Sequence, residues 1–153
     1  MKIRIEIDET LEEDEVVIRC RELTEQIGKV QKAVSEVIGG TEKFVGYKEN
    51  TEYYLALDSI LFFETENGGV WAHTRDDIYQ TKQKLYELEE MLPGSFMRIS
   101  KSTILNTNHI YAINRNITST SVVKFEHCHK QVYVSRYYYK PLISKLEEKR
   151  LRQ

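Results

Sequence analysis

The chain has 153 residues, of which 41% are hydrophobic and 30% charged, and its formal net charge is −2. This length fits one domain with a short extension, and this composition supports a packed core with a well-solvated surface. No apolar run approaches the roughly 20 residues that span a bilayer, and the N-terminus lacks the apolar stretch of a signal peptide. Two cysteines, Cys20 and Cys128, do not make a disulfide framework. We therefore expect a cytoplasmic protein.

The small net charge hides an uneven distribution along the chain. Residues 1–94 carry 11 Lys and Arg against 21 Asp and Glu, whereas residues 95–153 carry 11 against 3. Such a split favours a basic face that meets a polyanion such as nucleic acid. The alternative is that the two halves neutralise each other in the fold.

Residues 1–44 are expected to form a small β-β-α element. Residues 1–8 alternate between apolar and polar side chains, and residues 16–21 do the same, which is the period of half-buried strands. Thr24 can cap a helix with apolar residues at i, i+3, i+7 and i+10 from Ile27. Such an element is too small to bury its own core. We expect it to pack on the main domain or to dimerise with a second copy.

Residues 45–153 are expected to form a mainly β domain with short helices. Thr81 is expected to cap a helix that Pro93-Gly94 ends. A terminal helix is expected from about Tyr138, with Pro141 in its first turn. Many short strands at even spacing favour an antiparallel sandwich over a parallel sheet. The expected strands cover residues 43–48, 52–58, 60–64, 70–74, 78–80, 110–114, 121–125 and 131–135.

The segment after Pro93-Gly94 is the first candidate for a functional site. Arg98, Ser100 and Ser102 share one face if the segment is extended. If the chain turns after Ile99, Lys101 is exposed at the tip. Lys and Ser are common donors to the phosphate oxygens of DNA. The alternative is an ordinary solvated strand edge, where a lysine blocks aggregation.

The second candidate lies where the last expected strand meets the terminal helix. Arg136 follows Ser135 and can project from this junction, and an Arg fork can bond guanine O6 and N7 together. The alternative is an Arg paired with an acid. Tyr138 and Lys140 follow in a run of three tyrosines, where aromatic rings beside cations can stack on bases or line phosphates. At least one of these tyrosines is expected in the core.

Other chemistry is poorly supported. The run His127-Cys128-His129 has metal-ligand residue types, but no second pair completes a tetrahedral site, and the segment is typical of a hairpin turn. The chain has no nucleotide-binding glycine loop, no zinc-protease motif and no nucleophile elbow. We therefore expect no cofactor, no metal, no catalytic residue and no enzymatic activity.

These motifs resemble the LytTR family of bacterial DNA-binding domains, which are the output domains of LytR/AgrA-type response regulators. The resemblance covers about residues 45–148 and keeps the family's order. The matching segments are the early strand Ile60–Glu64, the helix Leu85–Leu92, the core motif Phe96-x-Arg98-x-x-Lys101-Ser102 with Asn106, and the terminal Val134-Ser135-Arg136. Each segment alone is a weak signal, whereas four in order at suitable spacing are a strong one.

The resemblance implies an elongated fold of small antiparallel sheets that reads the major groove with loops instead of a recognition helix. Three loops are implied: the tight turn at Asn67-Gly68-Gly69, the loop Ser100-Lys101-Ser102, and Ser135-Arg136 with the start of the last helix. Where some relatives place a larger polar side chain in the first loop, this chain has glycine. The residues expected at DNA are Asn67, Gly68, Arg98, Ser100, Lys101, Ser102, Ser135, Arg136, Tyr138 and Lys140.

Many relatives also carry an N-terminal receiver domain, and residues 1–44 are too short for one. The chain is thus similar to stand-alone members, which implies control by abundance, by dimerisation or by a sequestering membrane protein instead of phosphorylation. The leading hypothesis is a transcriptional regulator that binds double-stranded DNA at paired half-sites as a homodimer. The alternative is a protein-interaction module that docks an acidic partner through its basic C-terminal half.

Overall fold

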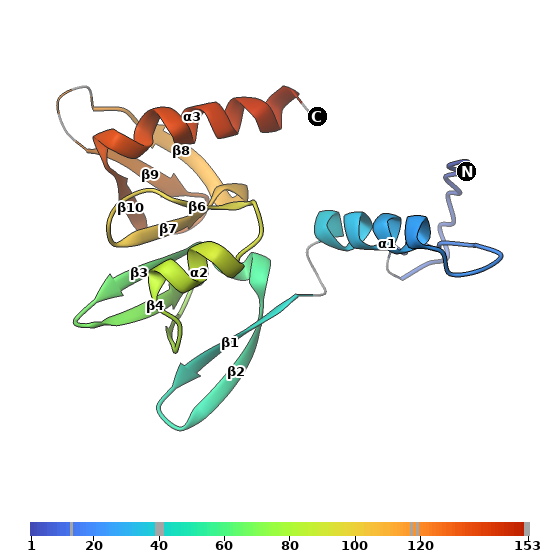
Figure 1. The fold of residues 1–153 in the computed structure, drawn as a ribbon, viewed down its shortest axis with the longest axis horizontal. Helices are drawn as coiled ribbons and strands as arrows, with labels where there is room; N and C mark the ends of the chain where they lie inside the picture. The colour runs from blue at the N-terminus through green and yellow to red at the C-terminus, as the bar shows by residue number, and fades with distance from the viewer. Residues whose placement is uncertain (13, 39–41, 117, 119, 152–153) are drawn as a thin grey trace. The chain divides into compact units, whose positions relative to one another are not determined.

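The computed structural model describes residues 1–12, 14–38, 42–116, 118 and 120–151. The chain divides into two compact units, Met1–Val37 and Ile38–Gln153 (Figure 1). This division falls before the expected boundary between residues 44 and 45, because strand β1 (Lys43–Lys48) pairs with strands of the second unit.

The N-terminal unit contains all but the last residue of helix α1 (Glu25–Ile38), which confirms the expected helix. The Thr24 hydroxyl accepts a hydrogen bond of 3.3 Å from the N–H of Ile27, as an N-cap does. The two expected strands are wrong, because no strand forms in residues 1–12 or 14–24. Ile3 and Ile7 are more than nine-tenths exposed. Alternation favours a strand only where a sheet and a core receive it, and a lone hairpin is marginal in water.

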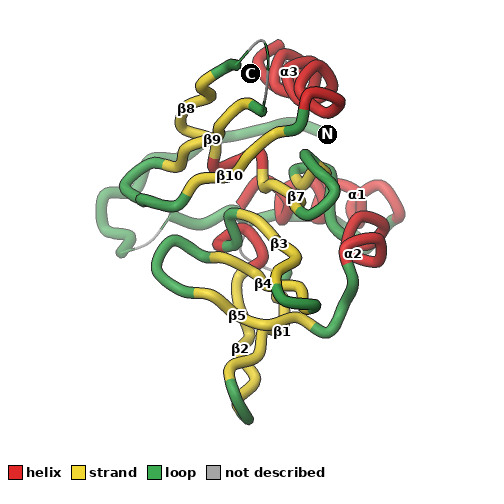
Figure 2. The backbone as a smooth tube through the Cα atoms, turned by 90° about the vertical axis from the view of Figure 1, so that its left-hand side faces the viewer, coloured by secondary structure: helices red, strands yellow, loops and turns green. Residues whose placement is uncertain are grey.

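The second unit is built on two antiparallel sheets, which confirms the mainly β, antiparallel fold class. The larger sheet has seven strands in the order β2-β1-β5-β4-β3-β7-β6, and the smaller has three in the order β10-β9-β8 (Figure 2). Besides β1, the strands are β2 (Thr51–Ala56), β3 (Phe62–Glu66), β4 (Gly69–His73), β5 (Ile78–Thr81), β6 (Phe96–Arg98), β7 (Thr103–Asn106), β8 (Ile110–Asn114), β9 (Ser121–Phe125) and β10 (Gln131–Val134).

Two hydrophobic cores lie on opposite faces of the larger sheet, because side chains alternate along its central strands. Phe63 enters a first core with Leu88 of helix α2 (Leu85–Met91). Phe62, the preceding residue, enters a second core. That core also receives Val123 of β9 and Leu142 of helix α3 (Arg136–Leu151), so the smaller sheet and α3 are joined to the larger sheet by one apolar interior.

Both helices of the second unit begin at residues other than those expected. Helix α2 starts at Leu85, where the Glu87 carboxylate accepts a 3.1 Å bond from the N–H of Lys84. Thr81 does not cap it; this residue is buried at the end of β5. Helix α3 starts at Arg136, not near Tyr138, so Pro141 lies in the second turn instead of the first. Two short 3-10 turns, η1 (Leu57–Ser59) and η2 (Thr107–His109), complete the unit.

Candidate nucleic-acid interface

The first expected loop is the tight turn between β3 and β4. Glu66 pairs with Gly69, and the two residues between them have positive φ angles, 51° at Asn67 and 79° at Gly68. Two consecutive positive φ angles are the geometry of a type I′ hairpin turn, which confirms the turn predicted from Asn-Gly. The flanking side chains are acidic: burial, and then the charge of Glu66, raise the pKa of Glu64. This turn therefore offers peptide groups and the Asn67 amide, but no cation.

The second expected loop connects β6 to β7. Ile99 is buried beneath it, and its N–H donates a 3.0 Å bond to the carbonyl of Thr103. The N–H of Ser102 donates to the Ser100 hydroxyl at 3.2 Å, which closes a tight turn. Lys101 is exposed at the tip, and its ammonium contacts no acceptor among the residues that the structure describes. Of the two conformations considered for this segment, the protein adopts the turn.

Arg98 does not share a face with Ser100 and Ser102, as an extended segment would require. Its guanidinium turns back under the loop, where Nε donates to the Ser100 carbonyl at 2.7 Å and Nη2 to the Lys101 carbonyl at 2.5 Å. Nη1 donates to the carboxylate of Glu89 in α2 at 3.1 Å. All three nitrogens of the side chain therefore have partners within the protein.

The third expected site is the junction between β10 and α3. Arg136 is the first residue of α3, is exposed, and forms no ion pair with any described acidic residue. The carbonyl of Ser135 accepts a 3.1 Å bond from the N–H of Tyr138. Lys140 is exposed one turn further along the helix. The alternative, an ion pair between Arg136 and an acidic residue, is therefore not found in the described part of the chain.

The run of three tyrosines divides between core and solvent. Tyr138 and Tyr139 pack against the second core with Leu142, and the guanidinium of Arg115 lies 4.9 Å from the ring of Tyr139. Tyr137 is 80% exposed. The exposed aromatic side chain is therefore Tyr137, not Tyr138, which was the tyrosine expected at DNA. The helical periodicity of the sequence indicates that Tyr138 is the buried one, because it precedes Leu142 by four residues and so shares its buried face.

Two backbone hydrogen bonds join the three loops. The N–H of Thr65, which is two residues before Asn67, donates to the carbonyl of Ser102 at 2.8 Å. The N–H of Ser135 donates to the carbonyl of Ile99 at 2.9 Å. The loop between β6 and β7 is therefore the middle of a continuous surface, with the other two on either side of it, all at one edge of the second unit (Figure 1).

A polar network holds the opposite ends of the same strands, and no local pattern in the sequence predicts it. The buried Asn106 amide donates to the Asp58 carboxylate at 3.2 Å, and its oxygen accepts from the N–H of Asn108 at 3.1 Å. The ring of His109 hydrogen-bonds the carbonyl of Asp58. Lys149 of α3 donates to the side-chain oxygen of Asn108 at 2.7 Å. The network ties η1, η2 and the second half of α3 together.

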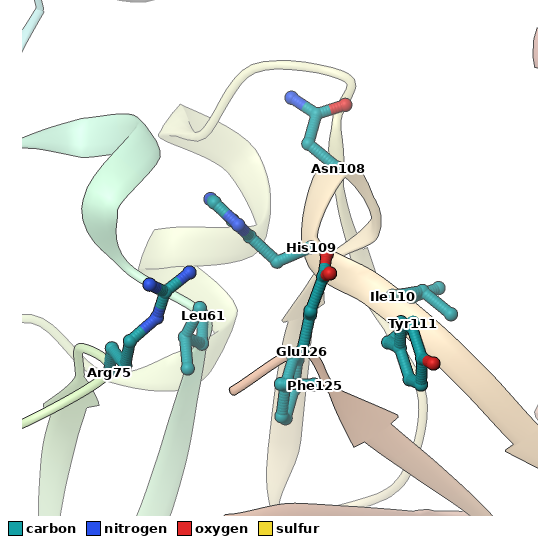
Figure 3. A pocket seen from close by; sticks show the side chains of 8 residues that line it. All are labelled: Leu61, Arg75, Asn108, His109, Ile110, Tyr111, Phe125 and Glu126. Carbon is teal, nitrogen blue, oxygen red and sulfur yellow. The ribbon is translucent and has the colours of Figure 1, made fainter. Parts of the chain in front are cut away.

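Beside this network lies a pocket of about 180 Å³ (Figure 3). Both signs of charge line it, and its residues are Leu61, Arg75, Asn108, His109, Ile110, Tyr111, Phe125 and Glu126. The run His127-Cys128-His129 forms the turn after β9, where His127 has a φ of 52° and the Cys128 thiol donates to the carbonyl of Arg75 at 3.4 Å. Among the described residues, no three His, Cys, Asp or Glu are grouped to hold a metal ion.

His73, at the end of β4, is a half-buried titratable residue that no sequence motif had marked as functional. Its ring stacks on Phe62 with centroids 4.2 Å apart, and neither ring nitrogen has a hydrogen-bond partner among the described residues. Burial, and then the nearby Lys130 ammonium, lower its pKa to about 4. That ammonium is itself fixed by the carbonyls of Thr74 at 2.9 Å and Asp77 at 2.8 Å. His73 is therefore neutral near pH 7.

Comparison with known proteins places this surface in a family. The sequence model of one protein family, the LytTr DNA-binding domain, matches residues 51–147, and this range includes all three loops. The chain belongs to the LytTR family. An uncharacterized HTH-type transcriptional regulator of Staphylococcus aureus (strain bovine RF122 / ET3-1) is 30% identical over 106 residues, which cover 69% of this chain and 71% of that protein. Its counterpart in strain NCTC 8325 / PS 47 is 29% identical over 110 residues, which cover 72% and 74%.

A solved structure shares the fold. The LytTr DNA-binding domain of a response regulator from Bacillus cereus superposes with a TM-score of 0.64 at 24% identity, covering 70% of this chain and 98% of that one. The names of the staphylococcal relatives mention a helix-turn-helix. In this chain, five strands separate α2 from α3, and no two α-helices follow each other directly in the described residues. No helix in the described part is long and apolar enough to cross a membrane.

Proposed function

We propose that this protein is a transcriptional regulator that binds double-stranded DNA in a sequence-specific way through the three loops. The observation that carries the proposal is their assembly. Segments separated by more than thirty residues meet at one edge, joined by the Thr65–Ser102 and Ser135–Ile99 hydrogen bonds, within the family's DNA-binding domain. Loops that a rigid scaffold holds in this way are common carriers of binding function. We propose no catalytic role for any residue.

The two loops that carry cations have different proposed roles: one contacts the phosphates of DNA, and the other contacts its bases. The Lys101 ammonium is exposed at the tip of the middle loop and is free to contact phosphate, which contributes affinity without sequence information. Arg136 projects from the first residue of α3, and its planar fork suits the two acceptors on guanine in the major groove. Further donors to the phosphates of the DNA backbone flank these groups: the hydroxyls of Ser100, Ser102 and Ser135, and the ammonium of Lys140.

The turn between β3 and β4 contributes differently. It has no cation, Glu66 is adjacent, and Gly68 has no side chain to reach a base. Asn67 is exposed, and its amide can pair with the edge of adenine in the major groove. The peptide N–H groups of the turn remain available as donors to phosphate. This loop thus contributes less to affinity than the other two.

The N-terminal unit is proposed to dimerise, so that two DNA-binding domains meet two half-sites. Its apolar side chains support this, since Ile3, Ile5 and Val37 are each more than four-fifths exposed. Exposed apolar groups in this number are typical of surfaces that meet a partner. The other proposed partner is a membrane protein that sequesters the regulator.

The test is fluorescence anisotropy on the duplex upstream of the protein's own gene, compared with a scrambled duplex across a salt series. Tight, salt-dependent binding with preference for the native duplex supports the regulator. Equal binding to both duplexes calls for selection of the operator from random DNA. Absence of binding to either duplex at low salt contradicts the proposal and favours the interaction module with an acidic partner. Light scattering at the same concentrations tests the dimer.

A further inference from the structure

The guanidinium of Arg98 faces into the protein beneath the middle loop, although the motif containing it is the one that suggests DNA contact. We infer that Arg98, held by Glu89 of α2, is a positioning residue that aims the loop between β6 and β7 at DNA without contacting DNA itself. The inference rests on the proposed function, since it assigns a role within that DNA-binding surface.

The hydrogen bonds of Arg98 link three separate groups. Nε and Nη2 hold the carbonyls of Ser100 and Lys101 at 2.7 and 2.5 Å, and Nη1 holds Glu89 at 3.1 Å. The Arg98 side chain is only 19% exposed, whereas the Glu89 side chain is 51% exposed. A bidentate grip on two successive carbonyls with a third bond to a carboxylate fixes a planar guanidinium more firmly than any single bond.

The hydrogen bonds from Arg98 set the direction of the loop's peptide groups. In a trans peptide, the carbonyl and the N–H point in opposite directions. Because the Ser100 carbonyl points at Arg98, the N–H of Lys101 points away from it, and this N–H donates to no other described group. The loop therefore turns the negative ends of its peptide dipoles inward. It presents an N–H and the Lys101 ammonium outward, which is the arrangement that an anion requires.

Glu89 connects the hydrogen bonds of Arg98 to the first core. Leu88, its neighbour in α2, is fully buried in the first core, so the helix that carries Glu89 is fixed to the sheet. The Glu89 carboxylate also neutralises the guanidinium charge. Arg98 thus adds little long-range attraction for phosphate, and its contribution to DNA binding acts through the geometry of the loop.

The first experiment needs no DNA. Amide hydrogen exchange is measured by NMR on the 153-residue chain at three amides that depend on this loop: Ser102, Thr65 and Ser135. Arg98→Lys keeps the positive charge but cannot hold two carbonyls and a carboxylate together, and we expect exchange at these amides to accelerate about tenfold. Glu89→Ala should accelerate it to a smaller degree.

Glu90→Ala is the matched control. Glu90 follows Glu89 in α2, is exposed, and makes no side-chain hydrogen bond among the described residues, so its replacement removes the same charge but no support for Arg98. We expect exchange in this variant to equal that of the wild type. Equal exchange in all four proteins would overturn the inference.

The second experiment compares DNA affinity across a salt series. We expect Arg98→Lys to bind about tenfold more weakly with an unchanged salt slope, because no phosphate contact is lost. Lys101→Ala should lower the slope by about one. Wild-type affinity in Arg98→Lys would overturn the inference, because a lysine can replace a phosphate contact but not the positioning role. If the wild type binds no duplex, the proposed function fails, while the exchange experiment still decides whether Arg98 orders the loop.

Discussion

The two ends of the central strands differ in their exposed cations, although at the loop end Arg98 is bound within the protein. At the end that carries the three loops, Lys101 and Arg136 are exposed and without partners among the described residues. At the other end, Lys149 donates to the hydroxyl of Thr107 at 2.6 Å, and Lys130 donates to two backbone carbonyls. All four belong to the basic C-terminal half. A count of charges therefore indicates only the basic half of the chain, whereas the exposed donors without protein partners indicate the surface that we propose for DNA binding.

This comparison predicts that substitutions at the network end change stability and that those at the loop end change DNA binding. Asn106→Ala is expected to have the largest effect. The side chain is fully buried, and its loss leaves the Ile60 carbonyl, which it bonds at 2.9 Å, and the N–H of Asn108 without their partners. We expect about 3 kcal/mol lower stability in urea unfolding. Asn114→Ala, at an exposed position of β8, is the control, and an equal loss there would contradict the role of the network.

The second prediction concerns acid stability. The pKa of His73 is about 4 in the folded state against 6.5 for an ordinary histidine. Between these values the unfolded chain binds a proton that the native state does not, so the free energy of unfolding falls as pH falls from 6.5 to 4. The full loss is about 3 kcal/mol.

His73→Phe removes this titration and preserves stacking on Phe62. Urea unfolding between pH 7 and pH 4 should therefore show a flatter pH dependence in the variant than in the wild type. Parallel curves for the two proteins would show that His73 does not titrate in this window.

The third prediction concerns the loop end. Arg136→Ala should weaken binding to specific DNA by about 1–3 kcal/mol and weaken binding to random duplex much less, because the lost contact is to a base. Stability in urea should stay within about 0.5 kcal/mol of the wild type, since the side chain is exposed. Lys149→Ala is the matched control, which should lower stability while the preference for specific DNA is kept. An equal loss on both duplexes in Arg136→Ala would exclude base reading by this residue.

The smallest expected effect is at the turn between β3 and β4. Gly68 has a φ of 79°, and a Cβ there would meet no atom within 4 Å, so Gly68→Ala is penalised only by backbone strain. We expect about 1 kcal/mol lower stability. Gly94→Ala has equal space without the positive φ, and it should change stability little. A neutral Gly68→Ala would mean that the turn adopts another conformation at no cost.

Local patterns in the sequence determined much of the second unit. Alternation and β-branched residues predicted the strand over Ile110–Asn114 with its observed bounds, because side chains that alternate between core and solvent have a period of two. Asn67-Gly68 predicted its turn, because glycine and asparagine adopt positive φ most readily. The Phe96-x-Arg98 motif, the later Ser135-Arg136 and their spacing indicated the family.

The tertiary structure decided what those segments do together. Residues 1–8 alternate as regularly as Ile110–Asn114, but without a sheet to receive them they form no strand. Arg98 was expected at DNA, and on one face with Ser100 and Ser102 if the segment was extended. Its guanidinium instead turns inward, because the loop folds back over it and α2 brings the Glu89 carboxylate within reach. The assembly of the three loops depends on hydrogen bonds between residues more than thirty positions apart. Periodicity along a chain fixes which side chains share a face, whereas contacts between distant segments depend on how those faces pack.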